Sequence, residues 1–274
     1  MLKNDFSISC LIVNYNYAKY LEECIESVLR QSYPVSEIIV VDNGSTDQSL
    51  NILRKFGRQV TIIANANNEG LCTALNRGIH ACSGSHIAFL DSDDRWFPDK
   101  TAIQVSLLEE TGAEFAYTDA EIIDEVGRVK SYRKSQLEGA ALEWLLQNPS
   151  ITPFTRSTIL LRKSLLFKSG LWDTNFKYGA EDFDLIRRCA ELTTLVGTNS
   201  PLTSIREHSK SGSSKNLKKI FPNYRDNLFC MVKWFVEPNN NLSFRYIVQA
   251  FLKLHFSYTK FLIKRFFSRN SGKD

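Results

Sequence analysis

The sequence predicts an α/β protein with a mostly parallel central sheet, helices on both faces and a C-terminal helical extension. Short apolar runs that suit buried strands alternate with segments of helical spacing, and these runs are nearly continuous. The composition then changes near residue 210, where a basic, aromatic-rich stretch begins. Continuous apolar strands that alternate with helices are typical of a parallel sheet covered on both faces.

The first part of the chain supplies the alternating elements. Apolar runs at 8–13, 37–42, 60–65 and 86–91 predict four strands, and EFAYTD at 114–119 predicts a fifth. Helical spacing over 20–31 and 70–82 and a helix start at Pro98 predict the intervening helices. The sequence has neither GxGxxG nor GxxxxGK[ST], so it shows no dinucleotide fingerprint and no P-loop.

Composition narrows the class and the compartment. The chain is 43% hydrophobic and 23% charged, as expected for a folded protein. Its six cysteines are scattered without a CxxC pair or a Cys/His cluster, which indicates reduced, buried thiols. The apolar run near the start is too short for a signal peptide or a membrane span. We therefore expect a cytoplasmic protein, with peripheral attachment to the inner face of the cell membrane left open by the tail.

Acidic side chains follow the fourth strand, in HIAFLDSDD. Asp91 and Asp93 are two positions apart, so in an extended segment both carboxylates point the same way. A hard divalent cation such as Mn²⁺ or Mg²⁺ would relieve their repulsion and suits oxygen ligands. The alternative is that these residues only cap the helix near Pro98. Asp42, at the end of a neighbouring strand, favours the cation site.

Several blocks, in order from about residue 8 to 214, resemble family 2 glycosyltransferases of the GT-A fold. The opening block runs from IVNYNY to VDNGSTD, and the second runs from NEGLCTALNRG to the DXD motif in LDSDD. TRSTILLRKSLL, GLWDTNFKYGAEDFDLIRRC and IREHSKSGS follow. The resemblance implies a GT-A, Rossmann-like fold and an inverting sugar transfer that depends on a divalent metal. It also implies a nucleotide-sugar, expected to be UDP-linked, as co-substrate.

The resemblance also implies roles for individual residues. Tyr15 would lie against the nucleotide base and Asp42 would hydrogen-bond it. Asp182, beside Glu181, would be the general base that accepts the proton of the attacking hydroxyl. The implied nucleotide-binding residues are Tyr15, Asn16, Asp42, Asp91 and Ser92, and the implied metal ligands are Asp91, Asp93 and His208. Asn76 is a further nucleotide-binding candidate, and a plain packing role in its helix is the alternative. The residues alone leave a second interpretation of Glu181 and Asp182, an acidic first turn of a helix.

Two departures from the family pattern bear on the acceptor side. Phe183 stands where the family often has Trp, and GLWDTNF replaces a GGFDE-type run, so Trp172 is expected to reshape the acceptor side. There is no QxxRW motif, which argues for a single addition rather than a processive synthase. The expected enzyme is a hexosyl- or N-acetylhexosaminyl-transferase of surface polysaccharide biosynthesis that acts on a saccharide or lipid-linked saccharide.

The tail has a different character from the rest of the chain. Residues 215–274 hold twelve basic and three acidic residues, and the segment from Ser243 has basic and aromatic residues at amphipathic helical spacing. Such a helix suits a membrane surface, or docking on its own domain or a second subunit as an oligomer contact. Nucleic-acid binding rests on charge alone, and we expect no nucleic-acid partner.

The predicted organisation is a glycosyltransferase domain at 1–212 and a helical tail at 213–274. Within the domain, the nucleotide-binding part covers about 1–118 and the acceptor part about 119–212. Two rival functions are a nucleotidyltransferase of sugar activation and a non-catalytic, membrane-associated nucleotide-sugar binding protein. The first would need a Gly-rich basic signature near the first strand, which VNYNYAKY lacks. The second would have no need of Asp93 and Asp182.

Overall fold

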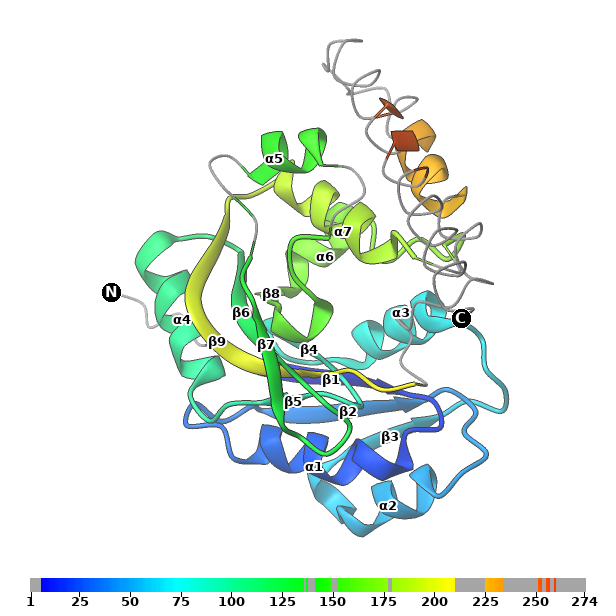
Figure 1. Ribbon diagram of the computed structural model, residues 1–274. Coiled ribbons are helices and arrows are strands. Elements are labelled where there is room, and N and C mark those ends of the chain that lie inside the picture. Colours follow the sequence, from blue (N-terminus) through cyan, green and yellow to red (C-terminus); the bar gives the residue numbers. More distant parts are fainter. Residues whose placement is uncertain are drawn as a thin grey trace, which may run out of the picture.

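One curved, mixed sheet forms the centre of the computed structural model (Figure 1). The structure describes residues 6–135, 137, 141–148, 152–176, 179–209 and 225–233, together with 251, 252, 255, 256 and 259. Its strands are β1 Ile8–Asn14, β2 Glu37–Asp42, β3 Thr61–Ala64, β4 His86–Asp91, β5 Arg95–Trp96, β6 Phe115–Ile123, β7 Val129–Arg133, β8 Leu160–Arg162 and β9 Leu195–Arg206. They lie in the order β3-β2-β1-β4-β8-β6-β9-β5, and β7 pairs with β6.

Seven α-helices and two short 3-10 turns accompany these strands in the described residues up to 209. The helices are α1 Ala18–Leu29, α2 Ser49–Lys55, α3 Leu71–Ala81, α4 Lys100–Thr111, α5 Ala141–Gln147, α6 Lys163–Ser169 and α7 Glu181–Ala190. The 3-10 turns are η1 Gly57–Gln59 and η2 Arg156–Thr158. All five strands and all three helices predicted from the first part of the sequence are present, with ends within a few residues of the expected ones.

The N-terminal half is the parallel part of the sheet, with helices on both faces (Figure 1). Leu11 of β1 packs in one core with residues of α3, and the adjacent Ile12 packs in the other with residues of α1. Successive side chains of a strand point to opposite faces, so both faces must be apolar. This explains why the strands read as unbroken apolar runs.

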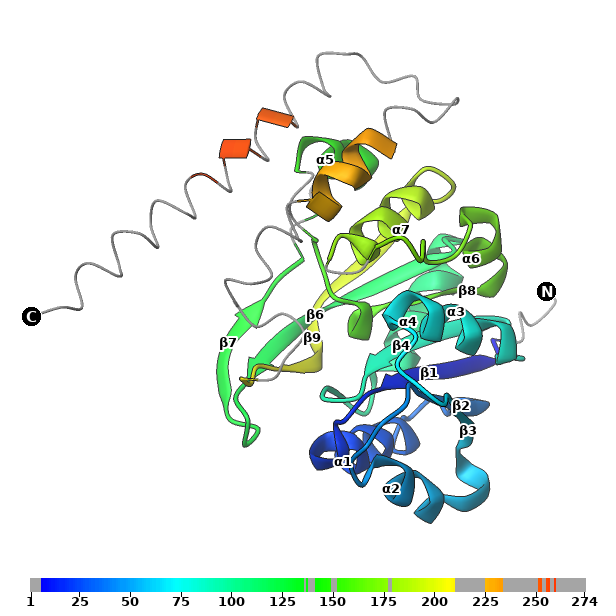
Figure 2. The ribbon, with the colours of Figure 1, turned by 90° about the vertical axis from the view of Figure 1, so that its right-hand side faces the viewer.

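The strands of the second half pair mostly antiparallel, and the sequence pattern indicates them less clearly. β8 pairs antiparallel with both β4 and β6, β7 with β6, and β5 with β9, while the long β9 runs parallel to β6. Figure 2 shows the β6–β7 hairpin extending away from the rest of the sheet. β5 and β8 have two and three residues, and β7 is almost fully exposed, so they carry little hydrophobic pattern.

Part of the predicted tail packs on the core. Residues 225–233 are helical, Cys230 and Met231 are buried, and Lys233 bridges Asp173 and Asp184 at 2.7 and 3.4 Å. All six cysteines are free and buried, as the sequence predicted.

Most of the amphipathic segment predicted from Ser243 lies outside the described residues. Of its members that are described, Phe251, Leu252 and Phe256 are helical and exposed. No helix within the described residues is long and apolar enough to cross a membrane.

Candidate active site

The carboxyl ends of β1, β2 and β4 lie level with one another at one edge of the sheet. Asn14 at the end of β1 pairs with Asp42 at the end of β2, and Val13 pairs with Asp91 at the end of β4. The predicted convergence of these strand ends is therefore present. Polar side chains from three segments that are distant in sequence meet there.

Asp42 lies in the floor of this edge rather than on its surface. Its side chain is fully buried, and its oxygens accept hydrogen bonds from Asn14 Nδ2 at 2.8 Å and from the Ser45 N–H at 3.0 Å. These contacts fix the turn that follows β2. Base recognition by Asp42 stays a prediction, and the observed contacts give the carboxylate a role in shaping the loop.

Asn16 fastens the loop after β1 to the same turn. Its backbone is left-handed, with φ of 60°, an unusual conformation for a residue other than glycine. Its Oδ1 accepts hydrogen bonds from the N–H groups of Thr46 and Asp47, at 2.7 and 3.3 Å. The neighbouring Tyr15 is 42% exposed, as a platform for a ring-shaped ligand would be.

The acidic turn after β4 places three carboxylates close together. The turn is closed by the Asp94 N–H, which donates to the Asp91 carbonyl, and by Ser157, whose hydroxyl donates to Asp94 and accepts from the Asp91 N–H. Burial, and then the charge of Asp91, raises the pKa of Asp93. Burial and the charges of Asp93 and Asp91 likewise raise the pKa of Asp94. Asp91 and Asp93 remain partly accessible, whereas Asp94 is buried.

His208 comes from beyond the end of β9 to meet this turn. Its Nε2 lies 3.0 Å from Asp93 Oδ2. The rings of Tyr17 and Tyr20 flank the imidazole, with centroids 5.4 and 5.0 Å away. Arg206, two residues earlier, donates its N–H to Asp94 and so fixes the approach of the strand. His208, which is far from the DXD motif in the sequence, thus contacts the second of its two carboxylates, Asp93.

The chemistry of these donors fits a divalent cation only in part. Asp91, Asp93 and His208 offer oxygen and nitrogen ligands, and the crowding of like charges favours a cation. Within the described residues, however, no group of three or more His, Cys, Asp or Glu side chains is already arranged as a metal site. A bound cation would therefore need further ligands, such as the phosphate oxygens of a substrate.

The two remaining predicted nucleotide contacts differ in their surroundings. The hydroxyl of Ser92 is buried and has no hydrogen-bond partner among the described residues. Asn76 instead holds the backbone of Trp172: its Nδ2 donates to the Trp172 carbonyl at 2.8 Å, and its Oδ1 accepts from the Trp172 N–H at 3.0 Å. The structure thus engages both ends of the Asn76 amide within the protein.

Glu181 and Asp182 open α7 beside the acidic turn. Ala180, which precedes them, has a φ of 67°, so the chain enters the helix through a strained residue. The Asp182 Oδ1 accepts a hydrogen bond from the indole of the buried Trp172, at 3.2 Å. Burial, and then the charge of Asp182, raises the pKa of Glu181 to about 7. The acids lie in the first turn of a helix, as the second interpretation has it, and the role of Asp182 as general base stays a prediction.

Arg156, in η2, joins the two acidic groups. Its Nε and Nη2 donate to Asp91 Oδ1 at 3.0 and 2.6 Å, and its Nη1 donates to Asp182 Oδ1 and Oδ2 at 2.9 and 3.1 Å. Burial alone would lower the pKa of Arg156, but the carboxylates of Asp182 and Asp91 outweigh it and raise this pKa. Sequence reasoning did not single out this residue, although it lies in the quoted block TRSTILLRKSLL.

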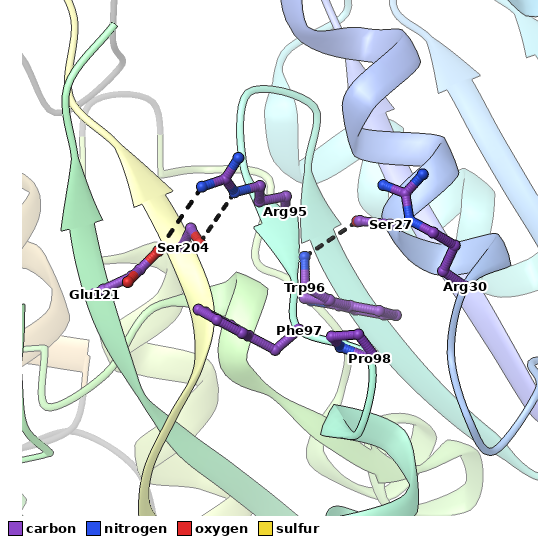
Figure 3. Close-up of a pocket in the computed structure, with 8 residues that line it drawn as sticks. All are labelled: Ser27, Arg30, Arg95, Trp96, Phe97, Pro98, Glu121 and Ser204. Atoms are coloured by element: carbon purple, nitrogen blue, oxygen red, sulfur yellow. Dashed lines mark hydrogen bonds and ion pairs between the residues drawn. The ribbon is translucent and has the colours of Figure 1, made fainter. Parts of the chain in front are cut away.

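A separate cavity of about 290 Å³ lies between the end of α1 and β5 (Figure 3). As far as the structure describes its lining, it contains none of the predicted site residues. The Arg95 guanidinium on its wall is already engaged by Ser204 at 3.2 Å and by Glu23 at 2.5 Å. The carboxylates at the strand ends, rather than this cavity, offer the chemistry for catalysis.

Comparison with known proteins identifies the family of this chain. The sequence model described as Glycosyl transferase family 2 matches residues 9–169. An uncharacterized glycosyltransferase of Rickettsia conorii is 32% identical over 207 residues, which cover 74% of this chain and 33% of the relative. The chain thus spans about a third of the length of that relative.

Two further matches extend the comparison. The Escherichia coli protein named UDP-Glc:alpha-D-GlcNAc-diphosphoundecaprenol beta-1,3-glucosyltransferase WfgD is 32% identical over 122 residues, covering 44% of this chain and 48% of WfgD. The crystal structure of S. aureus TarS 1-349 in complex with UDP-GlcNAc superposes with a TM-score of 0.71. That match has 20% identity and covers 92% of this chain and 73% of the other, and it shows a shared fold.

Proposed function

This chain belongs to glycosyltransferase family 2, and we propose that it moves one sugar from a nucleotide-sugar donor to an acceptor hydroxyl, with inversion at the anomeric carbon. Its fold is the GT-A fold that the sequence predicted. One observation carries the proposal. Asp182 of α7 lies within the span of one guanidinium from Asp91 at the end of β4, although the two residues are far apart in the chain.

The proposed roles follow from the positions of the carboxylates. Asp91 and Asp93, with His208, would hold Mn²⁺ or Mg²⁺, which when bound neutralises the charge of the diphosphate. Asp182 accepts the proton of the acceptor hydroxyl while the acceptor oxygen bonds to the anomeric carbon. The bond from that carbon to the diphosphate oxygen breaks, and its electron pair leaves with the diphosphate. Attack opposite the leaving group inverts the configuration.

The proposed donor and acceptor classes rest on the name of a relative, and the proposed membrane attachment rests on exposed apolar residues of the tail. WfgD is named for a UDP-Glc donor and a diphosphoundecaprenol-linked acceptor, which supports a UDP-sugar and a lipid-linked saccharide in surface polysaccharide synthesis. Exposed Phe251, Leu252 and Phe256 support peripheral attachment of the tail to the inner face of the cell membrane.

Calorimetry with UDP, GDP and dTDP, each with and without Mn²⁺, tests the proposal. We expect UDP to bind in the presence of Mn²⁺ and to lose at least tenfold in affinity in Asp93→Ala, because this change removes a ligand of the cation. Asp99→Ala is the control, since Asp99 is exposed at the start of α4. Absence of binding to all three nucleotides would contradict the proposal. Binding of UDP without any turnover of UDP-sugars would instead support the non-catalytic binding protein.

A further inference from the structure

The strongest feature that the proposed roles do not use is the link made by Arg156. Its side chain is 8% exposed, whereas those of Asp91 and Asp182 are 32% and 22% exposed. The arginine therefore lies beneath the site, and the two carboxylates lie between it and the solvent. Four hydrogen bonds connect the guanidinium to the two acids, so Arg156 joins Asp91 to Asp182.

The shape of a guanidinium makes this link rigid. Its N–H groups lie in one plane at fixed angles, so a carboxylate on each edge is fixed relative to the other. A lysine ammonium carries the same charge but has no such fork. Because Asp91 belongs to β4 and Asp182 to α7, the guanidinium fixes the start of α7 relative to the end of β4.

We propose that Arg156 is a positioning residue. By binding both Asp91 and Asp182, it fixes the position of the Asp182 carboxylate relative to the nucleotide-sugar. This inference rests on the proposed function. Transfer requires the base to be held within a fraction of an ångström of the attacking hydroxyl, and errors of about 1 Å can lower rates about 100-fold. The rigid link from Asp91, which is proposed to bind the nucleotide-sugar, through Arg156 to Asp182 would supply that precision.

The same contacts select the oxygen that acts as base. Asp182 Oδ1 accepts from both Arg156 and the indole of Trp172, whereas Oδ2 accepts only from Arg156 among the described residues. Asn76 holds the backbone of Trp172 on both sides, so the indole is itself fixed. Oδ2 is therefore the oxygen with capacity for the proton of the acceptor hydroxyl.

Steady-state kinetics of Arg156→Ala and Arg156→Lys test the inference. We expect kcat to fall about 100-fold or more in Arg156→Ala, while KM for the donor and the affinity for UDP with Mn²⁺ change less than threefold. Arg156→Lys should recover a small part of kcat. Millimolar guanidinium should restore part of kcat to Arg156→Ala, and sodium chloride at the same ionic strength should not. Arg162→Ala is the matched control, because Arg162 lies six residues away and pairs with Glu114 nearer the surface.

Other outcomes would overturn the inference. An unchanged kcat in a folded Arg156→Ala, or a loss confined to donor affinity, would exclude a positioning role. A double-mutant cycle of Arg156→Gln and Asp182→Asn, read as melting temperatures, tests the link without any activity. The two shifts should be less than additive, and full additivity would show that the residues do not interact. Failure of the wild-type protein to bind any of UDP, GDP and dTDP would defeat the proposed function, and the cycle would still decide whether the link exists.

Discussion

The Asp182 carboxylate is held by two partners that lie far away from it in the sequence. An acidic pair at the start of a helix is common, because the helix dipole favours it. Here Arg156 comes from the turn before β8 and Trp172 from the loop before α7, and both donate to the same carboxylate. The acid could be predicted from the sequence through family resemblance, but its two donors could not.

Asp182→Asn should abolish transfer and leave donor binding intact. The amide keeps the shape of the side chain but cannot take the proton, so we expect kcat to fall by about 10²–10⁴. Calorimetry with UDP and Mn²⁺ should give an affinity within threefold of wild type. Asp99→Asn, at the exposed start of α4, is the matched control. Retained turnover in Asp182→Asn would remove this residue as the base.

Glu181 makes a prediction about stability and pH. Its pKa rises from 4.5 to about 7 in the folded protein, so between those values the native state binds more protons than the unfolded state. The contribution of Glu181 to the free energy of unfolding therefore decreases as pH rises from about 4.5 to 7, by on the order of 2–3 kcal/mol.

Urea unfolding of wild type and Glu181→Gln at pH 5 and pH 8 tests this sign. The variant cannot ionise, so it should gain stability relative to wild type as the pH rises. The exposed Glu109→Gln should show no such change. A difference between wild type and Glu181→Gln that does not depend on pH would contradict the raised pKa.

At the level of elements, the packing of α3 on the sheet depends on one glycine. A Cβ on Gly78 would clash with Leu11 Cδ1 and would lie 2.9 Å from Leu11 Cδ2 and 3.1 Å from Val41 Cγ2. Alanine inside a helix normally stabilises by about 0.5–1 kcal/mol relative to glycine. Here the overpacking should outweigh that gain, because the side chains of Leu11 and Val41 that the Cβ would meet are themselves buried.

Gly78→Ala should therefore lower the free energy of unfolding by about 1–3 kcal/mol. Chemical denaturation measures this change, and Glu109→Ala on the exposed face of α4 is the control for helix propensity. A stabilised Gly78→Ala would mean that α3 can move away from β1 at little cost. Because α3 also carries Asn76, we expect the shift to reduce kcat as well.

The two halves of the sheet differ in how well the sequence predicts them. β1, β2 and β4 are buried on both faces, and β3 is a partly exposed edge strand; their unbroken apolar runs and turn residues identify all four. β7 lies at an edge and is exposed, β5 has two residues, and β9 contains Asn199-Ser200-Pro201 in its middle. Their pairing depends on long-range register, which local pattern does not encode.

At the scale of the whole molecule, positive charge is concentrated in the C-terminal part of the sequence. Residues 215–274 are strongly basic, while the rest of the chain has a net negative charge. The described helix at 225–233 is attached to α7 by the ion pair of Lys233 with Asp184, so these residues pack with the core. Removing the chain from residue 243 onwards should therefore spare the site.

Deleting residues 243–274 should weaken binding to anionic vesicles at least tenfold and leave UDP affinity unchanged. Basic residues near an anionic surface each contribute about 1 kcal/mol, and buried aromatic side chains add to this. Sedimentation with vesicles of mixed anionic and neutral lipid, at low and high salt, measures the change. Phe256→Ser should reproduce part of the loss, whereas Val126→Ser, at an equally exposed apolar residue between β6 and β7, should not. If the deletion leaves vesicle binding unchanged and instead alters the oligomeric state, the tail serves as a contact between protein surfaces.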